Sequence, residues 1–392
     1  MTAAGAAAAG IALPPALPAA GAPDPLPPPF APEVFRDRQA RLRAGARAAG
    51  MDVLFVTPST NLAYTANLAI GRSERLTALL LFVDGPSVLV TPSFEATNHK
   101  RDVVADDVVT WEENEDPDAL VAKNLRKAKV VGIEGSTAYN AAARLRAAAS
   151  VEERDATPVF DSLRMVKSAG EQALIRDAAR RTSQAIAATH KRLSRGMTER
   201  EVSTLLEQEF HKLGVSGGGL VQFGPSAALP HGGPGDRRLA VGDVVLIDSG
   251  CKVRGYTSDV TRTICFGPPS DELRKVYATV DRAQRAGIEA LAAGVAGEDV
   301  DRAARKVIED AGYGQFFTHR LGHGLGMDGH EPPYLVRGNK TPLAAGNTVT
   351  IEPGIYLPGK LGVRIEDDYA AVAGGPPVSL STRPGELVVM AG

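Results

Sequence analysis

Four acidic residues interrupt apolar segments that otherwise have the composition of buried β-strands in the second half of this chain. They are Asp248 in Leu-Ile-Asp-Ser-Gly, Asp259 in Ser-Asp-Val-Thr-Arg-Thr, Glu352 in Ile-Glu-Pro-Gly and Glu366 in Gly-Val-Arg-Ile-Glu-Asp. A carboxylate in an apolar strand is partly desolvated, and burying it unpaired costs several kcal/mol. The fold must therefore bring positive charge to these strands. A bound cation compensates four carboxylates more simply than four separate Lys or Arg partners do.

Histidine residues lie near the same segments. His231 precedes the first acidic strand, and His319, His323 and His330 lie between the second and the third. Four carboxylates with one imidazole form an oxygen-rich ligand set, which suits Mn²⁺ and tolerates Co²⁺ or Zn²⁺. Because four carboxylates exceed what one catalytic ion needs, we expect two ions about 3.5–4 Å apart, bridged by carboxylates and a water. Such a pair generates hydroxide near neutral pH and polarises a carbonyl, so the sequence predicts hydrolytic chemistry.

Length and composition indicate a globular enzyme with more than one domain. The 392 residues exceed the usual size of one domain, and 44% hydrophobic residues suffice for a sizeable core. The net charge of −2 provides no field that would attract nucleic acid or an anionic membrane. No apolar stretch reaches the length of about 18 residues that a transmembrane helix needs. With only Cys251 and Cys265, the chain has neither a disulfide scaffold nor a thiolate zinc cluster.

The chain divides into three segments. Residues 1–30 are rich in Ala and Pro and are expected to form a flexible arm. A truncated export signal is the alternative for this arm, but no Lys or Arg precedes its apolar stretch, so we predict a cytoplasmic protein. Residues 31–160 alternate strand-like runs with helical patterns and end in a strand near 157–160, which predicts an α/β domain. Residues 161–392 contain helices, one starting at the capping box Thr198-Glu199-Arg200-Glu201, and then strands, which predicts an α+β domain.

Six segments resemble, in order and spacing, the motifs of the pita-bread metallopeptidases, a group that includes methionine aminopeptidase, aminopeptidase P, prolidase and creatinase. These segments are 229–232 (Leu-Pro-His-Gly), 246–250, 258–263, 322–331 (Gly-His-Gly-Leu-Gly-Met-Asp-Gly-His-Glu), 351–356 and 362–367. Asn61-Leu-Ala-Tyr-Thr-Ala-Asn-Leu and Leu163-Arg-Met-Val-Lys-Ser resemble the prolidase, aminopeptidase P and creatinase branch, whose N-terminal domain the methionine aminopeptidases lack. The resemblance implies a creatinase-like N-terminal α/β domain (31–160) followed by a pita-bread catalytic domain (161–392).

The same resemblance implies roles for the matching residues. It implies two metal ions and five ligands, of which Asp259 and Glu366 bridge both ions: Asp248, Asp259, His323, Glu352 and Glu366. Glu352 also matches the position of a proton shuttle. His231 and His330 match imidazoles that contact the substrate carbonyl or the leaving nitrogen during catalysis.

Two further residues are candidates for contact with the substrate. For His319, substrate contact and a plain structural hydrogen bond are both open. Arg364 lies two residues before Glu366 and on the same strand face by alternation. Its two possible roles are to hold a substrate carboxylate and to orient Glu366.

We therefore predict a dinuclear-metal hydrolase that cleaves the Xaa-Pro peptide bond. Proline lacks the amide hydrogen and carries a ring, so this bond demands a dedicated pocket. Xaa-Pro dipeptidase (prolidase) is favoured because Arg364 can pair with a free proline carboxylate. Aminopeptidase P, which acts on longer peptides, is the alternative because relatives of that kind carry the same Arg. All five ligands are present and no charged extension is, which argues against a metal-free creatinase-like enzyme and a non-catalytic pita-bread binding module.

The resemblance also implies a homodimer that acts on short proline-containing peptides. In this branch the N-terminal domain covers the mouth of the active site and often joins a second subunit. Residues of the 33–160 region are therefore expected to contribute to the interface and to limit substrate length, whereas the Ala/Pro arm is expected to be dispensable.

Overall fold

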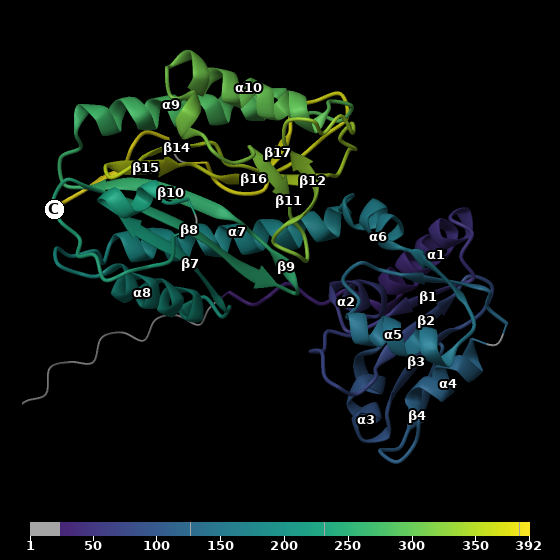
Figure 1. Ribbon diagram of the computed structural model, residues 1–392. Coiled ribbons are helices and arrows are strands. Elements are labelled where there is room, and N and C mark those ends of the chain that lie inside the picture. The colour runs from purple at the N-terminus through teal and green to yellow at the C-terminus, as the bar shows by residue number, and fades with distance from the viewer. Residues whose placement is uncertain (1–23, 126, 231, 384) are drawn as a thin grey trace, which may run out of the picture.

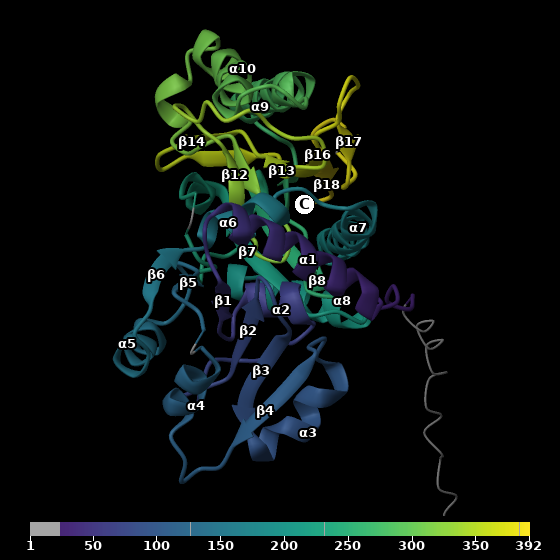
Figure 2. The same ribbon diagram turned by 90° about the vertical axis from the view of Figure 1, so that its right-hand side faces the viewer.

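The computed structural model describes residues 24–125, 127–230, 232–383 and 385–392, which form two units (Figure 1). The N-terminal unit contains the helices α1–α6 and the strands β1–β6, and the C-terminal unit contains the remainder from α7 onward. Figure 2 shows that α1 and α6 lie where the two units meet. Among the helices in the described ranges, none has both the length and the apolar character that crossing a membrane requires.

The N-terminal unit is a mixed six-stranded sheet with helices on both faces. Its strand order is β4-β3-β2-β1-β5-β6, so β1 lies inside the sheet, antiparallel to β2 and parallel to β5. Alternation along β1 sends Leu54 to the face covered by α1 and α6, and Phe55 to the face covered by α4 and α5. The elements are α1 (Pro32–Ala48), β1 (Val53–Val56), α2 (Thr60–Ala66), β2 (Ala78–Phe82), β3 (Ser87–Pro92), α3 (Ser93–Asp102), β4 (Asp107–Trp111), α4 (Pro117–Asn124), β5 (Val130–Ile133), α5 (Tyr139–Ala148), β6 (Glu152–Asp155) and α6 (Thr157–Arg164).

The last strand of this unit is not at residues 157–160, where the sequence predicts it. This segment begins α6, whose first turn contains Pro158. Its Phe160 packs in the core between the sheet and α1. The last strand is β6, which pairs with β5 at the edge of the sheet. Its sequence, Glu-Glu-Arg-Asp, has no apolar alternation, because an exposed edge strand needs none.

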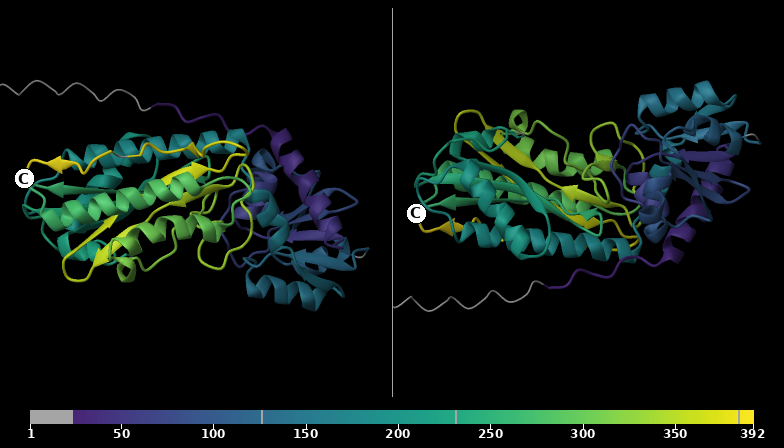
Figure 3. Two further views of the ribbon diagram at one scale, coloured as in Figure 1. Left: turned by 90° about the horizontal axis from the view of Figure 1, so that it is seen from above. Right: turned by 90° about the horizontal axis from the view of Figure 1, so that it is seen from below.

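The C-terminal unit packs helices on both sides of its strands (Figure 1, Figure 3). One sheet has the order β18-β10-β8-β7 and another has the order β12-β11-β13-β16-β17, while β14 and β15 form a separate hairpin. The predicted capping box at the start of α8 is confirmed, since Thr198 and Glu201 each bond the other's backbone N–H. The elements are α7 (Ala169–His190), α8 (Glu199–Lys212), β7 (Gly217–Phe223), β8 (Asp243–Val253), β9 (Tyr256–Thr257), β10 (Val260–Phe266), α9 (Asp271–Ala290), α10 (Gly297–Asp310), β11 (Gly322–Gly324), β12 (Glu331–Leu335), β13 (Thr348–Ile351), β14 (Gly354–Leu357), β15 (Leu361–Arg364), β16 (Asp367–Ala370), β17 (Val378–Ser379) and β18 (Val389–Met390).

Two cores lie on opposite faces of β8 and determine which way its polar residues point. Val245 and Ile247 join the core formed with α7 and α8, whereas Val244 and Leu246 join the core formed with α9 and α10. Asp248 lies two residues after Leu246 and therefore points to the same face of β8 as Val244 and Leu246. It therefore points into the space between the two larger sheets, where the remaining acidic residues also lie.

Residues 24–30, which the sequence assigns to a flexible and dispensable arm, contact the C-terminal unit. Arg181 donates a hydrogen bond to the backbone oxygen of Asp24 (3.1 Å), and Leu26 and Phe30 pack against the core between α7 and β8. The expectation of a free arm is therefore wrong for this stretch, because two apolar side chains and a buried guanidinium hold it. The preceding part of the arm, residues 1–23, lies outside the described residues.

Candidate metal centre

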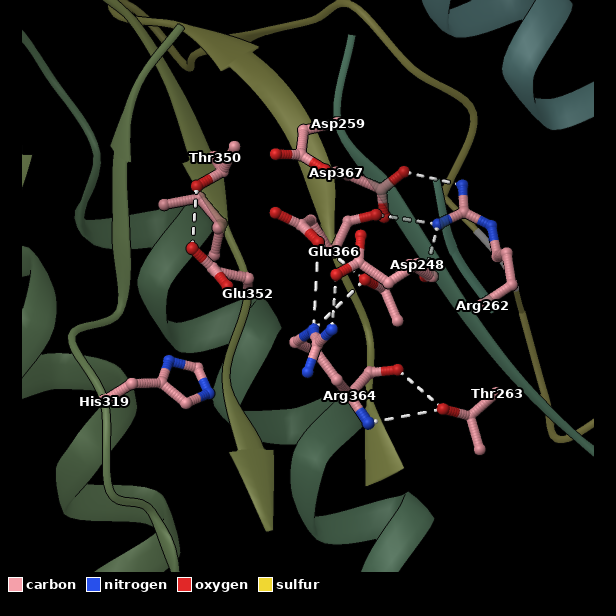
Figure 4. A network of polar contacts seen from close by, with 12 residues as sticks. Asp248, Asp259, Arg262, Thr263, His319, Thr350, Glu352, Arg364, Glu366 and Asp367 are labelled. Carbon is pink, nitrogen blue, oxygen red and sulfur yellow. Dashed lines mark hydrogen bonds and ion pairs between the residues drawn. The ribbon is translucent and has the colours of Figure 1, made fainter. Parts of the chain in front are cut away.

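The five predicted ligand residues come together from five separate segments. Asp248 belongs to β8 and His323 to β11, whereas Asp259, Glu352 and Glu366 lie just before β10, after β13 and after β15. Figure 4 shows the four carboxylates gathered in one region. The Nε2 atom of His323 lies 3.4 Å from Glu352 Oε1 and 3.7 Å from Asp259 Oδ2. Potential ligand atoms lie within 4.8 Å of one another in three groups: Asp248 with Asp259 and Glu366, His323 with Glu352 and Glu366, and Asp259 with His323 and His330.

Glycine residues on both sides of His323 allow its strand to approach its neighbours closely. A Cβ atom on Gly322 would lie 2.0 Å from the backbone oxygen of Thr350, and one on Gly324 would lie 2.3 Å from that of Pro332. Any side chain at either position would push β11 away from β13 or β12. The two glycines of the Gly-His-Gly sequence therefore allow β11 to lie close enough to its neighbours for the imidazole of His323 to reach the carboxylates.

Hydrogen bonding selects the tautomer of His323. Its Nδ1 atom lies 3.0 Å from the backbone oxygen of Gly324, which can only accept, so Nδ1 carries the proton. The Nε2 atom is left with a lone pair that faces Glu352 and Asp259. A histidine that ligates a metal is held in this way, with its other ring nitrogen donating to a carbonyl.

Burial and mutual repulsion oppose the ionisation of these carboxylates. Burial, followed by the charge of Asp248, raises the pKa of Asp259 well above its usual value, and burial with the charge of Asp259 does the same to the pKa of Glu366. Burial raises the pKa of Glu352 to about 8 and lowers the pKa of His323 to about 3. The cluster therefore lacks positive charge at neutral pH. Its oxygen-rich donor set, with one neutral imidazole, fits a divalent cation.

The cluster lines a cavity of about 490 Å³. The lining residues are Pro230, Asp248, Asp259, His319, Arg320, His323, His330, Glu352, Arg364 and Glu366. Every predicted site residue that the structure describes is among them. His231 lies outside the described residues, although the preceding Pro230 lines the cavity. Arg320 was missed by the sequence reasoning, and its only signal was its place between His319 and the Gly-His-Gly motif.

His319 and Arg364 belong to one chain of polar contacts along the cavity wall, in which Tyr356 joins the two. Figure 4 shows the part of this chain in which Arg364 contacts Asp248. Tyr356 donates its hydroxyl proton to His319 Nε2 (2.8 Å) and accepts a hydrogen bond from Arg364 Nη1 (2.8 Å). Arg364 also donates from Nη2 to Asp248 Oδ2 (2.5 Å) and from Nε to Thr261 Oγ1 (3.1 Å). All three guanidinium nitrogens thus contact side chains of this chain. The same Nε lies 3.9 Å from Glu366 Oε2, as expected for residues on one strand face.

A network of four charged residues lies behind the loop that carries His330. Its members are the buried Arg164, Lys167 and Glu331 and the partly exposed Asp328, and we call these four residues the joint network. Arg164 Nη2 donates to Asp328 Oδ2 (2.6 Å) and Glu331 Oε2 (2.5 Å), and Lys167 Nζ donates to Glu331 Oε1 (2.7 Å). Arg164 is the last residue of α6 and Lys167 follows this helix at the boundary of the two units, whereas Asp328 lies in the loop before β12 and Glu331 begins that strand. The backbone position of His330 is therefore set by charges outside its own sheet.

The joint network is also bonded to the start of α2 in the N-terminal unit. Arg164 Nη1 donates to Asn61 Oδ1 (3.0 Å), and Thr60 Oγ1 donates to Asp328 Oδ1 (2.6 Å). Asn61 is held in turn by a hydrogen bond from its amide nitrogen to Glu134. The two units therefore share one continuous polar contact that reaches the residue next to His330.

Comparison with known proteins gives the family. Residues 173–373 match the model of metallopeptidase family M24, and residues 38–166 match the creatinase/prolidase N-terminal domain. The chain belongs to metallopeptidase family M24. The fold class and the family expected from the six motifs are thereby confirmed, and the chain is a hydrolase of a family that uses divalent metals.

Relatives and solved structures of similar proteins cover most of this M24 chain. An uncharacterized peptidase of Staphylococcus aureus (strain MSSA476) is 38% identical over 321 residues, 81% of this chain and 91% of the relative. The dipeptidase PepE from Mycobacterium ulcerans is 37% identical with a TM-score of 0.86, covering 92% of this chain and 99% of that one. An Xaa-Pro dipeptidase from Bacillus anthracis (31%, TM-score 0.85, 91% and 100% covered) and an X-Pro aminopeptidase from Thermotoga maritima (30%, 0.80, 88% and 100%) are also similar.

Metal should stabilise this M24 peptidase more at high pH than at low pH. A carboxyl group whose pKa is raised on folding stabilises the folded state while it is protonated, so this contribution is lost as pH rises. For Glu352 the window runs from its ordinary value of 4.5 to about 8. We expect the Tm of the EDTA-treated protein to fall across this window and the rise caused by Mn²⁺ to be larger at about pH 8 than at about pH 5. Differential scanning fluorimetry measures both, and an equal rise at the two pH values would contradict the charge argument.

Proposed function

We propose that this chain is a dinuclear-metal hydrolase that cleaves the Xaa-Pro bond of dipeptides. The observation that carries the proposal is the convergence of four carboxylates and a neutral imidazole on one cavity. Similar solved structures named as Xaa-Pro dipeptidase and prolidase support the substrate class. The alternative is an Xaa-Pro aminopeptidase that acts on longer peptides, which the similarity to the X-Pro aminopeptidase from Thermotoga maritima favours.

The five ligands divide between the two ions in this proposal. Asp259 and Glu366 each share one group of potential ligand atoms with Asp248 and another with His323, which are assigned to different ions, and this supports a bridging role for both. Asp248 would complete the shell of one ion, and His323 with Glu352 that of the other. Two such ions supply a hydroxide near neutral pH and a Lewis acid for the scissile carbonyl, with Mn²⁺ preferred and Co²⁺ or Zn²⁺ tolerated.

The remaining residues supply positioning and proton transfer. Burial raises the pKa of Glu352 to about 8 in the absence of metal. Two bound cations would favour its ionised form, which could take up a proton from the attacking water and return it to the leaving nitrogen of proline. Arg364 fixes the orientation of Asp248, and Tyr356 and His319 fix that of Arg364 through the polar chain described above. We therefore assign Arg364 the orienting role rather than the binding of a substrate carboxylate.

Hydrolysis of matched peptides tests the proposal. The purified protein, loaded with Mn²⁺, is given Ala-Pro and Gly-Pro, the tripeptide Ala-Pro-Ala, and the proline-free dipeptides Ala-Ala and Ala-Leu. We expect the Xaa-Pro dipeptides to be cleaved fastest. Faster cleavage of Ala-Pro-Ala would establish the aminopeptidase alternative, and preference for Ala-Ala or Ala-Leu would remove proline specificity from the assignment.

His330→Ala should keep the metal and lose most turnover. Arg320 Nη2 lies 3.3 Å from His330 Nδ1, and because a guanidinium can only donate, Nδ1 accepts and Nε2 carries the proton. A donor in this position acts on charge that develops in the transition state, which is worth about 2.7–4 kcal/mol, or a hundred- to thousand-fold in kcat. Metal content by mass spectrometry and steady-state kinetics measure the two effects. The same result is expected for His231→Ala, and loss of metal from either variant would make that residue a ligand instead.

We also propose a homodimer in which residues of the 33–160 region contribute to the interface and limit the length of the substrate. Light scattering at micromolar concentration should give twice the chain mass of 41.0 kDa. The proposal assigns residues 1–30 to an N-terminal arm, residues 31–160 to the N-terminal domain and residues 161–392 to the catalytic domain. A monomer with normal dipeptide turnover would refute the length-limiting role while leaving the metal chemistry in place.

A further inference from the structure

Two arginines are the only permanently cationic side chains among the described residues that line the cavity. One of them, Arg364, is 3% exposed and spends its three nitrogens on Thr261, Tyr356 and Asp248. Its charge is already paired with Asp248, and each of its three nitrogens already donates to a side chain of this chain. The other, Arg320, is half-buried in the cavity wall.

The surroundings of Arg320 leave its charge available to a ligand. Its guanidinium lies over the ring of Tyr334, 4.5 Å from the centroid, and Nη2 donates to the neutral His330. Within the described part of the chain, no salt bridge joins Arg320 to a carboxylate, unlike Arg364 and Arg164. Stacking on an aromatic ring holds the guanidinium plane without neutralising it.

The backbone on both sides of Arg320 is fixed by α10. Arg305 donates to the backbone oxygen of His319 (2.8 Å), and the backbone N–H of Leu321 donates to Asp301 Oδ1 (3.0 Å). Asp301 and Arg305 also form a two-bond ion pair with each other. Arg320 therefore extends into the cavity from a rigid segment, so little conformational entropy is lost when it binds a ligand.

We propose that Arg320 binds the C-terminal carboxylate of a dipeptide substrate and so determines the preference for dipeptides over longer peptides. This inference rests on the proposed function of the site. A guanidinium offers two parallel N–H donors that match a carboxylate, whereas the amide that occupies this place in a longer peptide carries no charge.

Paired acid and amide substrates test this inference. The ratio of kcat/KM for Ala-Pro to that for Ala-Pro-amide isolates the carboxylate, since the two compounds share the scissile bond. We expect the wild-type ratio to be about 10–100, the factor that a charged hydrogen bond provides, and to approach 1 in Arg320→Ala, mainly through KM. Competitive inhibition by L-proline and L-prolinamide should show the same loss of discrimination.

Three variants separate this role from a structural one. If Arg320→Ala only disturbed His330, cleavage of both substrates would fall together and the ratio would stay at its wild-type value, which would overturn the inference. Arg320→Lys should give a ratio between those of the wild type and Arg320→Ala, because lysine keeps the positive charge but lacks the two parallel N–H donors of the guanidinium. Arg337→Ala, which removes an exposed arginine outside this cavity, should leave the ratio unchanged.

The outcome is distinguishable from failure of the proposed function. If the wild-type protein prefers Ala-Leu to Ala-Pro, proline specificity is lost, and the same ratio is then measured with Ala-Leu and Ala-Leu-amide. A wild-type ratio near 1, or a ratio that Arg320→Ala leaves unchanged, overturns the role of Arg320 with either pair.

Discussion

Asp259→Ala and Glu366→Ala should each abolish peptidase activity and lower the metal content of the purified protein. Each carboxylate shares one group of potential ligand atoms with Asp248 and another with His323, so its removal weakens both proposed ion positions rather than one. Metal content per chain, measured by mass spectrometry after dialysis, should fall by at least one ion. Turnover of Ala-Pro should fall to the background rate.

A surface acid provides the control for this experiment. Asp310 is exposed and pairs only with Lys306 one helical turn earlier, so Asp310→Ala should retain wild-type metal content and activity. Full activity of Asp259→Ala or Glu366→Ala at saturating Mn²⁺ would rule out the bridging assignment for that residue.

Glu331→Ala should destabilise the folded protein by about 3–5 kcal/mol, because it leaves buried cations without their partner. The side chains of Arg164 and Lys167 are 9% and 2% exposed, and both donate to Glu331. Burial already lowers the pKa of Lys167 while Glu331 opposes this effect, so the lysine can lose its proton in the variant. Arg164 cannot, and it retains only Asp328 as a charged partner.

Urea unfolding of the metal-free proteins measures this loss without a contribution from bound ions. Glu272→Ala is the matched control, because Glu272 forms an exposed ion pair with Lys360 and its removal should change stability by less than about 1 kcal/mol. A Glu331→Ala variant as stable as this control would mean that water or local rearrangement compensates the two cations. Turnover should also fall in Glu331→Ala, since the residue adjoins His330.

The parts of this site that follow strand periodicity could be predicted from the sequence. The strand at residues 348–351 was expected and is β13, and alternation in β8 places Asp248 on the side of the site. The acidic residues stand out because they violate the apolar character of their own strands. A local pattern of this kind survives folding, since the side chains of a strand point to alternate faces whatever lies beyond them.

The parts that depend on distant partners could not be predicted. Arg320 and Glu331 stand next to residues that were identified, but nothing near them in the sequence indicates that Tyr334 supports one and Lys167 the other. Likewise, β6 has a polar sequence because it lies at an edge, a property of the whole sheet and not of the strand. Contacts between different elements are set by topology, whether the partners are near in sequence, as Arg320 and Tyr334 are, or 164 residues apart, as Lys167 and Glu331 are, and local periodicity does not encode them.

The contact between Asn61 and Arg164 limits how the two halves of such a protein can be exchanged during evolution. A chimera that took its first half from a relative would combine that relative's residues at the start of α2 with an arginine and a 328–331 loop adapted to the present ones. Substitutions at the start of α2 and in the 328–331 loop should therefore occur in a correlated manner among homologues. Recombination would succeed most readily when the crossover carries residues 60–61, 164–167 and 328–331 together.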